Sequence, residues 1–218
     1  AGFVRYNFGE DKLEPRGAAD LVYKAGSACE AQIAETTLEE IQLIYEGATC
    51  DANSGAFVNL QDGVTVKGVV VTSPRHEASG SLHGYFVSDL NSGIGILLVV
   101  AKTENTDFPI GAILDITGDA LEYYCMTQIQ ASEVTQTGTH AGAIPATTLT
   151  KGDFLTVLEI YEGGYVTLVD AVVTNDAPEH GVFLVWDTLE VGNLFYEAGS
   201  KPATGTTLTT MRGVLRYA

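Results

Sequence analysis

The stretch VTVKGVVVT at residues 64–72, followed by GYFVSD at residues 84–89, decides the fold class of this chain. It consists of a run rich in β-branched residues, a polar interval, and a glycine-led aromatic segment that ends in aspartate. β-branched and aromatic residues favour strands, and short strands separated by glycine-containing turns are typical of sandwiches and barrels. We therefore expect an all-β protein.

The same pattern occurs a second time, as YVTLVDAVVT at residues 165–174 and GVFLVWD at residues 181–187. An internal repeat of this kind predicts two similar units in tandem. A stretch rich in glycine, threonine, alanine and proline separates the two copies and is typical of a linker. The expected organisation is an N-terminal extension at 1–34, a first barrel at 35–136, a linker at 137–148 and a second barrel at 149–218.

Residues 35–46 carry the one clear helix signal. Thr36 or Thr37 is followed three residues later by Glu39 or Glu40, a spacing that predicts a capping box. The apolar residues that would share one helix face are Leu38, Ile41 and Tyr45. Elsewhere the pattern predicts a polar loop at 73–84 and strands at 85–89, 94–101, 112–118 and 122–133.

The two ends of the chain resemble each other. GFVRY at residues 2–6 matches GVLRY at residues 213–217, and the first copy continues into a predicted hairpin over residues 1–16. The second barrel is therefore expected to lack its closing strand, and an unpaired edge recruits strands. We expect the hairpin to complete the barrel of a neighbouring subunit. The predicted contact residues are Phe3, Val4, Tyr6, Phe8, Leu13, Val214, Leu215 and Tyr217.

Charge disfavours a nucleic-acid partner. The formal net charge is −17, and the 11 lysines and arginines form no cluster in the sequence, whereas nucleic-acid binding usually requires clustered cations. No stretch is long and apolar enough to span a bilayer. The first residues, Ala1 and Gly2, suit a mature end left by signal peptidase. These features predict a secreted or cell-surface protein.

Three cysteines are present. Cys29 and Cys50 lie in similar small-residue settings, so a disulfide between them is predicted in an oxidising compartment, with two buried thiols as the alternative. Cys125 is expected to be a buried strand or turn residue, because it has no histidine or basic neighbour that would lower the pKa of its thiol.

No catalytic constellation is found. The sequence lacks a Gly-x-Ser-x-Gly elbow, a Cys-x-x-Cys pair and a His-Glu-x-x-His motif, so we expect no enzymatic activity and no cofactor. His76 and His83 flank one loop and could chelate a metal weakly, but such histidines are more often solvated loop residues, and the same holds for His140 and His180. A structural calcium is a second metal hypothesis, although solvated turns explain most of its candidate ligands. These are Asp51, Asn53, Asp62, Asp89, Asn91, Asp115, Asp119, Asp170, Asp176 and Asp187.

A further set of motifs lies at residues 35–42, 64–72, 84–89, 115–118 and 122–129 in the first half, and at 161–166, 194–196 and 213–217 in the second. Together they resemble the OB-fold domains found beside the catalytic domain of secreted bacterial nucleases, without that catalytic domain. The resemblance implies two tandem OB-like Greek-key barrels with one short helix and an N-terminal β-hairpin. In that family the motif at 213–217 continues into a segment similar to residues 8–16.

OB-folds bind oligomers through aromatic residues on one sheet face. Tyr85, Phe86, Tyr123 and Tyr124 are the residues that would supply such a face here, although core packing is the better default for them because adjacent residues of a strand point to opposite faces.

Three functional hypotheses follow. The first is a non-catalytic extracellular subunit that assembles head-to-tail through its N-terminal strand, as a homo-oligomer or a filament. A heterologous contact of this kind builds a filament when the subunits do not close into a ring. The second is an oligonucleotide- or polysaccharide-binding accessory module of a secreted nuclease. The third, an enzyme, has the least support. A simpler account of the termini is that the chain is one segment of a longer repeat protein.

Overall fold

The structure is a computed structural model, and it describes nine ranges of the chain. Strands dominate these ranges, so the expectation of an all-β protein is confirmed. The chain divides into two compact units, Ala1–Gln32 and Ile33–Ala218. The described residues are 2–7, 10–15, 35–44, 57–102, 107–154, 159–177, 182–192, 194–195 and 201–216.

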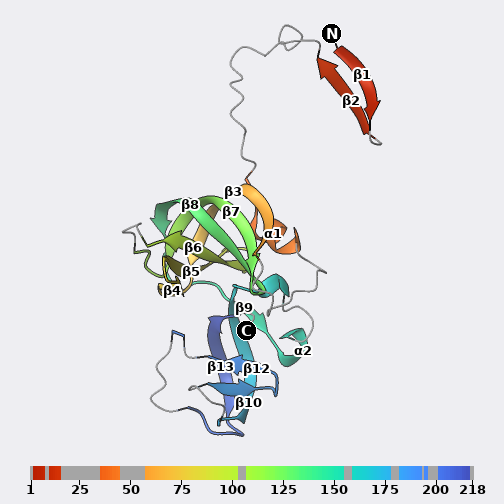
Figure 1. Ribbon diagram of the computed structural model, residues 1–218. Helices are drawn as coiled ribbons and strands as arrows, with labels where there is room; N and C mark the ends of the chain where they lie inside the picture. Colours follow the sequence, from red (N-terminus) through yellow and green to blue (C-terminus); the bar gives the residue numbers. More distant parts are fainter. Residues whose placement is uncertain are drawn as a thin grey trace. The chain divides into compact units, whose positions relative to one another are not determined.

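The first unit contains the predicted hairpin. Strands β1 (Gly2–Asn7) and β2 (Glu10–Pro15) pair antiparallel along their whole length (Figure 1). Residues that pair directly across an antiparallel ladder share a face. The register therefore places Val4 and Leu13, which are paired, on the same face as Tyr6.

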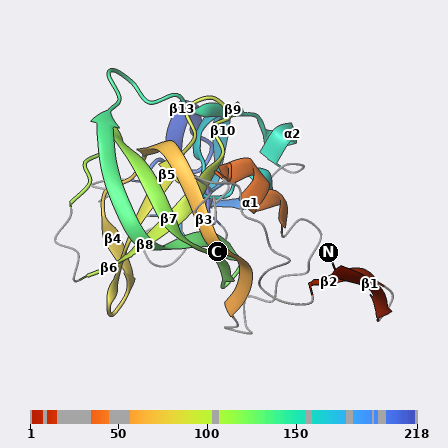
Figure 2. The ribbon, with the colours of Figure 1, turned by 90° about the horizontal axis from the view of Figure 1, so that it is seen from above.

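The first sheet of the second unit closes into a ring. Its order is β3-β7-β8-β6-β5, and an additional pairing between β5 and β3 completes the circuit, with β4 added beside β5 (Figures 1 and 2). Within the ring, β6 and β8 run parallel and the other pairs run antiparallel. The strands are β3 (Phe57–Val71), β4 (His76–Ser79), β5 (Leu82–Ser88), β6 (Gly95–Ala101), β7 (Ala112–Tyr123) and β8 (Met126–Thr139).

The interior of this ring is the larger core. Burial alternates along most of β7, as expected for a strand with one face inside a barrel. Leu114 and Ile116 from β7 pack with Val64 and Val66 from β3 and with Leu98 from β6. The β-branched run that predicted the fold class therefore supplies one wall of the core.

Helix α1 (Leu38–Ile44) begins at the predicted capping box. The Glu40 amide donates to Thr37 Oγ1 over 3.1 Å, and the Thr37 amide donates to Glu40 Oε2 over 2.8 Å. Leu38 and Ile41 are buried against the ring, as expected, whereas Tyr45 lies outside the described residues. Reciprocal capping of this type satisfies two backbone amides that the first helical turn leaves without partners.

The second sheet is open and has its own core. Its order is β12-β11-β10-β13, and β9 pairs parallel with β10 (Figure 1). Leu168, Val173, Phe183 and Val185 are among the residues of its core cluster. Its elements are β9 (Thr147–Leu149), α2 (Lys151–Phe154), η2 (Glu159–Tyr161), β10 (Tyr165–Asn175), β11 (Phe183–Val185), β12 (Leu189–Val191) and β13 (Thr207–Val214).

Three sequence-based boundaries were wrong. The polar loop expected at 73–84 contains β4 and the start of β5, which pair as a hairpin. The break expected after Gly118 is absent, because β7 continues to Tyr123 and β8 then runs to Thr139, inside the predicted linker. Gly118 marks a bulge and not a turn: a Cβ there would collide with the backbone of β8, lying 2.8 Å from Ala131 Cα.

A seam of glycines joins the ring to the open sheet. A Cβ on Gly95, at the start of β6, would collide with the Gly163 carbonyl, and one on Gly163 would lie 2.7 Å from Ile96 Cα. The buried Gln42 side chain from α1 bridges both sides, donating to Gly95 O over 2.8 Å and to Glu162 O over 3.0 Å. The two sheets therefore meet backbone against backbone at this seam.

We expect Gly163→Ala to lower the free energy of unfolding of the second unit by about 3 kcal/mol or more, through backbone strain added to a steric collision. Gly142→Ala is the matched control, because Gly142 also has a positive φ, 93° against 72° for Gly163, but no atom within 4 Å of an added Cβ. That control should cost about 1–2 kcal/mol. Urea unfolding measures both changes; equal losses would contradict the role of the seam.

Candidate functional site

The open sheet repeats the pairing pattern of four of the five ring strands. β10 pairs with β11 and β13 as β3 pairs with β5 and β7, and β11 pairs with β12 as β5 pairs with β6. In the ring, β8 lies between β6 and β7. Among the described residues no strand takes the corresponding place between β12 and β13, so the sheet has two unpaired edges there.

A groove of about 890 Å³ lies between these two edges. Its lining is mainly apolar and includes core residues of the open sheet. One edge of the groove comes from β12 and the other from β13 with the two residues after it. The apolar residues that line it include Val166, Leu168, Phe183, Leu189, Val191, Leu208, Met211, Val214 and Leu215.

The groove is positively charged, although the chain as a whole is acidic. Lys201, Arg212 and Arg216 line it, against one carboxylate, Glu190. These are three of the 11 basic residues of a chain whose net charge is −17. Arg212 and Arg216 are exposed, and neither forms an ion pair within the described part of the chain. Electrostatic complementarity therefore favours an acidic occupant.

The seam fixes the end of the groove. The amide of Gly163 donates to Leu215 O over 2.7 Å, and the amide of Leu215 donates to Gly164 O over 3.0 Å. The Leu215 side chain is 7% exposed and packs in the core of the open sheet. Of the predicted contact residues, Val214 and Leu215 thus line the groove, whereas Phe8 and Tyr217 lie outside the described residues.

An aromatic cluster lies at the groove wall contributed by the ring. His76 stacks on Phe86 with ring centroids 5.4 Å apart, and Phe195 packs edge-on against both, at 5.3 Å from His76 and 6.2 Å from Phe86. Burial lowers the pKa of His76, and the nearby positive charge of Arg216 lowers it further. A neutral imidazole is therefore favoured in the folded protein.

Two of the four aromatic residues predicted for a ligand face cannot serve there. Tyr85 and Phe86 are 0% and 1% exposed. Tyr85 packs inside the ring against Phe108, and Phe86 is covered by His76 from a strand that the sequence did not predict, together with Phe195. Both faces of β5 are covered at this point, so neither ring offers a stacking surface.

Tyr123 and Tyr124 remain at the turn between β7 and β8. Their rings lie edge-to-face at 4.5 Å, and Tyr124 is 51% exposed. Tyr124 and Cys125 both have positive φ angles, 49° and 55°, as the two central residues of a tight hairpin turn require. This conformation is unfavourable for side chains other than glycine, asparagine and aspartate.

Cys125 is disulfide-bonded and 5% exposed. The chain has only two other cysteines, Cys29 and Cys50, and both lie outside the described residues. The bridge predicted between Cys29 and Cys50 therefore stays a prediction.

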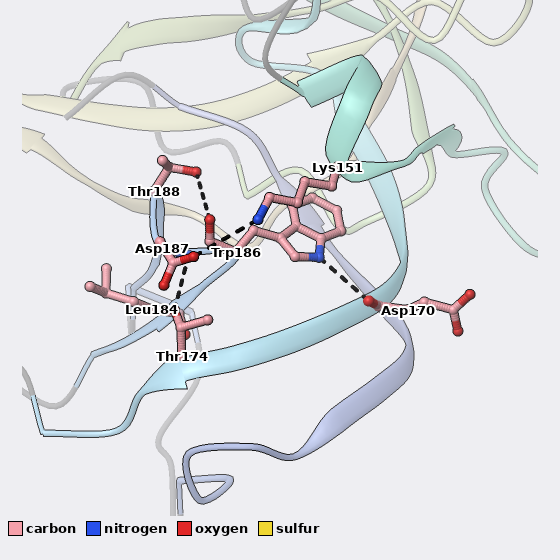
Figure 3. A network of polar contacts seen from close by, with 7 residues as sticks. All are labelled: Lys151, Asp170, Thr174, Leu184, Trp186, Asp187 and Thr188. Atoms are coloured by element: carbon pink, nitrogen blue, oxygen red, sulfur yellow. Dashed lines mark hydrogen bonds and ion pairs between the residues drawn. The ribbon is translucent and has the colours of Figure 1, made fainter.

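The single tryptophan lies in a polar network within the open sheet (Figure 3). Trp186 Nε1 donates to Asp170 O over 3.4 Å, and the Asp187 amide donates to Thr174 Oγ1 over 2.9 Å. Asp170 in β10 and Trp186 and Asp187 in the turn after β11 all have positive φ angles. Lys151 Nζ, from α2, lies 3.8 Å from Asp187 Oδ2. Trp186 is 4% exposed within the core of the open sheet.

Several of the histidines and carboxylates that the sequence offered for metal binding make other contacts, whereas Asp51, Asn53 and His180 lie outside the described residues. His76 stacks in the aromatic cluster, and His83 Nδ1 lies 3.6 Å from Glu77 Oε1. Asp89 Oδ1 accepts hydrogen bonds from the Asn91 and Ser92 amides, over 2.9 and 2.7 Å, and so caps a turn. In the ranges that the structure describes, no three histidine, cysteine or acidic residues cluster as metal ligands.

Comparison with known proteins gives no relative: no protein-family model matches the sequence, and no curated protein matches it. No helix in the described part of the chain has the length and hydropathy needed to cross a membrane.

Cys125→Ser should lower the free energy of unfolding by about 2–4 kcal/mol, because the disulfide restricts the unfolded chain. Urea unfolding with and without reductant measures this effect, and reductant should remove the difference between wild type and variant. Peptide mapping without reduction identifies the partner; a bridge between Cys29 and Cys50, with a free Cys125 thiol, would contradict the structure.

Acid should weaken the aromatic cluster. The folded-state pKa of His76 lies below its ordinary value, so the unfolded chain takes up the proton first as the pH falls. The stability contributed by the neutral ring is therefore present above about pH 6.5 and is lost below it. His76→Phe keeps a stacked ring without titration, so its urea midpoint should fall less than that of wild type between about pH 7.5 and 5.5. Equal falls in the two proteins would be evidence against this effect.

Proposed function

We propose that this protein is a non-catalytic subunit that assembles head-to-tail, with the N-terminal hairpin segment of one copy completing the open sheet of the next. The observation that carries the proposal is the groove between β12 and β13, bordered by two strand edges with which no strand of the described ranges pairs. Exposed edges recruit strands, and main-chain hydrogen bonds supply much of the affinity when a strand is added.

The hairpin has the chemistry of a matching occupant. Its second strand carries Glu10, Asp11 and Glu14 against one cation, Lys12, and would meet a groove lined by three cations. The apolar Val4, Tyr6 and Leu13 fall on one face by register and suit an apolar floor. A two-stranded hairpin is marginally stable alone, so binding to a sheet would stabilise it.

The architecture and setting that we propose are those of an extracellular protein built from OB-like barrels. A closed ring of five strands with one parallel pair supports the OB-like assignment of the first half, and the repeated strand pairing extends it to the second. The disulfide of Cys125 supports an oxidising compartment. The burial of Tyr85 and Phe86 leaves the oligomer-binding alternative without two of its four aromatic residues.

Deletion of residues 1–16 tests the proposal. The full chain should form oligomers or filaments that light scattering and electron microscopy detect, whereas the truncated chain should remain monomeric at the same concentration. Adding a peptide of residues 1–16 should occupy the groove of the truncated chain and raise its melting temperature, by ligand linkage.

Trp186 provides the control for folding. Its buried position predicts a blue-shifted emission, which both proteins should share if the deletion leaves the open sheet intact. A truncated chain that keeps this emission and still assembles as wild type does would disprove the proposal.

A further inference from the structure

The hairpin contains a copy of the edge that it would join. GFVRY in β1 matches GVLRY at residues 213–217, the end of β13 and the residues that follow it. β2 therefore pairs with β1 as a missing strand would pair with β13. We infer that β2 enters the groove of a second copy, antiparallel to β13 with Leu13 opposite Leu215, and that β1 stands in for β13 in the free subunit. This inference rests on the proposed function.

The register follows from the hairpin itself. β1 and β2 pair Gly2 with Pro15 and Val4 with Leu13. If residues 213–217 take the place of residues 2–6 in this ladder, Pro15 lies opposite Gly213 and Leu13 lies opposite Leu215. Leu13 is the one large apolar residue of β2, and Leu215 is buried in the core of the open sheet. A slip of one residue would turn a charged residue of β2 toward that core.

Strand direction agrees with the complete ring. There, β8 runs antiparallel to β7 and parallel to β6. In the open sheet β13 and β11 both run antiparallel to β10, and β12 runs antiparallel to β11. β12 and β13 therefore run in opposite directions. A strand antiparallel to β13 is consequently parallel to β12. β2 in this orientation would reproduce the place of β8 between its two neighbours.

Charge favours the exchange over the hairpin. In the inferred register Glu14 lies opposite Val214 and diagonal to both Arg212 and Arg216. In the hairpin Glu14 lies opposite Phe3 and has Arg5 as its diagonal neighbour among the described residues of β1. Diagonal neighbours in an antiparallel pair are within reach of long side chains. Exchange of β1 for β13 therefore gives Glu14 a second arginine neighbour.

Cysteine cross-linking tests the inference. We mix Pro15→Cys protein with Gly213→Cys protein, and Gly2→Cys protein with Gly213→Cys protein, with wild type as the background for the native cysteines. Positions paired across a ladder are close enough for a disulfide. Gly213 tolerates a side chain, because no atom lies within 4 Å of an added Cβ. The Pro15 mixture should yield cross-linked dimers, and the Gly2 mixture should not.

Deletion of residues 1–7 separates the roles of the two strands. In the full chain β1 competes with a second copy for β2, at an effective concentration of millimolar order. Deletion of β1 removes this competition, so assembly should begin at a roughly tenfold lower protein concentration. Glu14→Lys should weaken assembly more than Glu10→Lys, because in the inferred register Glu14 is diagonal to both Arg212 and Arg216, whereas Glu10 is diagonal to Arg216 alone. Trp186 emission again reports folding of the open sheet.

The outcomes distinguish the two proposals. Cross-links in the Gly2 mixture alone, or loss of assembly on deleting residues 1–7, would overturn the inference that β2 is the donor, while leaving assembly through the N-terminal segment intact. Assembly after deletion of residues 1–16 would instead remove the proposed function, and this inference with it. Cross-links in the Pro15 mixture together with enhanced assembly of the shorter deletion would establish both.

Discussion

The backbone contact between Gly95 and Gly163 is the constraint on which the rest of the second unit depends. Gly95, at the start of β6, and Gly163, in the turn before β10, leave no room for a Cβ, so the two backbones approach closely at this seam. Gln42 bonds across the seam, and Glu162 reaches the amide of Thr127 on the ring with its carboxylate over 2.9 Å. The neighbouring Gly164 in turn holds Leu215 at the end of β13. The position of the groove edge is therefore set by the seam and not by the open sheet alone.

A second constraint is the pair of strand edges, on β12 and β13, that no strand of the described ranges covers. An open sheet with an apolar floor exposes both main-chain hydrogen-bonding groups and hydrophobic surface, which a soluble protein normally covers. Here Leu194 and Phe195, 48% and 39% exposed, add to that surface beside the groove. The three cations around it give an otherwise acidic chain a local region that attracts acidic strands and repels cationic ones. Geometry and charge thus favour the same kind of occupant.

The sequence predicted the β class, the hairpin and the capping box of α1, because each depends on local residue patterns. The sequence also contains a short repeat that indicates the seam: IYEG occurs at residues 44–47 and again at 160–163, and the second copy includes Gly163 of the seam. The strand β4, the turn at Tyr124 and the disulfide of Cys125 were not predictable in this way. Each depends on partners distant in sequence or on a backbone conformation that its residue type disfavours. The burial of Phe86 belongs to the same class, since its cover comes from β4 and from Phe195.

The hairpin also bears on why assembly would be selective. Its strands are joined by only two residues, so β1 meets β2 at a far higher effective concentration than any second copy does. An intermolecular partner can displace β1 only by offering contacts that β1 lacks. The groove offers an apolar floor, a second edge on β12 and an additional arginine, whereas β1 offers a single ladder. A free edge without such a groove would lose this competition. The hairpin would therefore restrict strand addition to the open sheet and protect β2 from unspecific pairing.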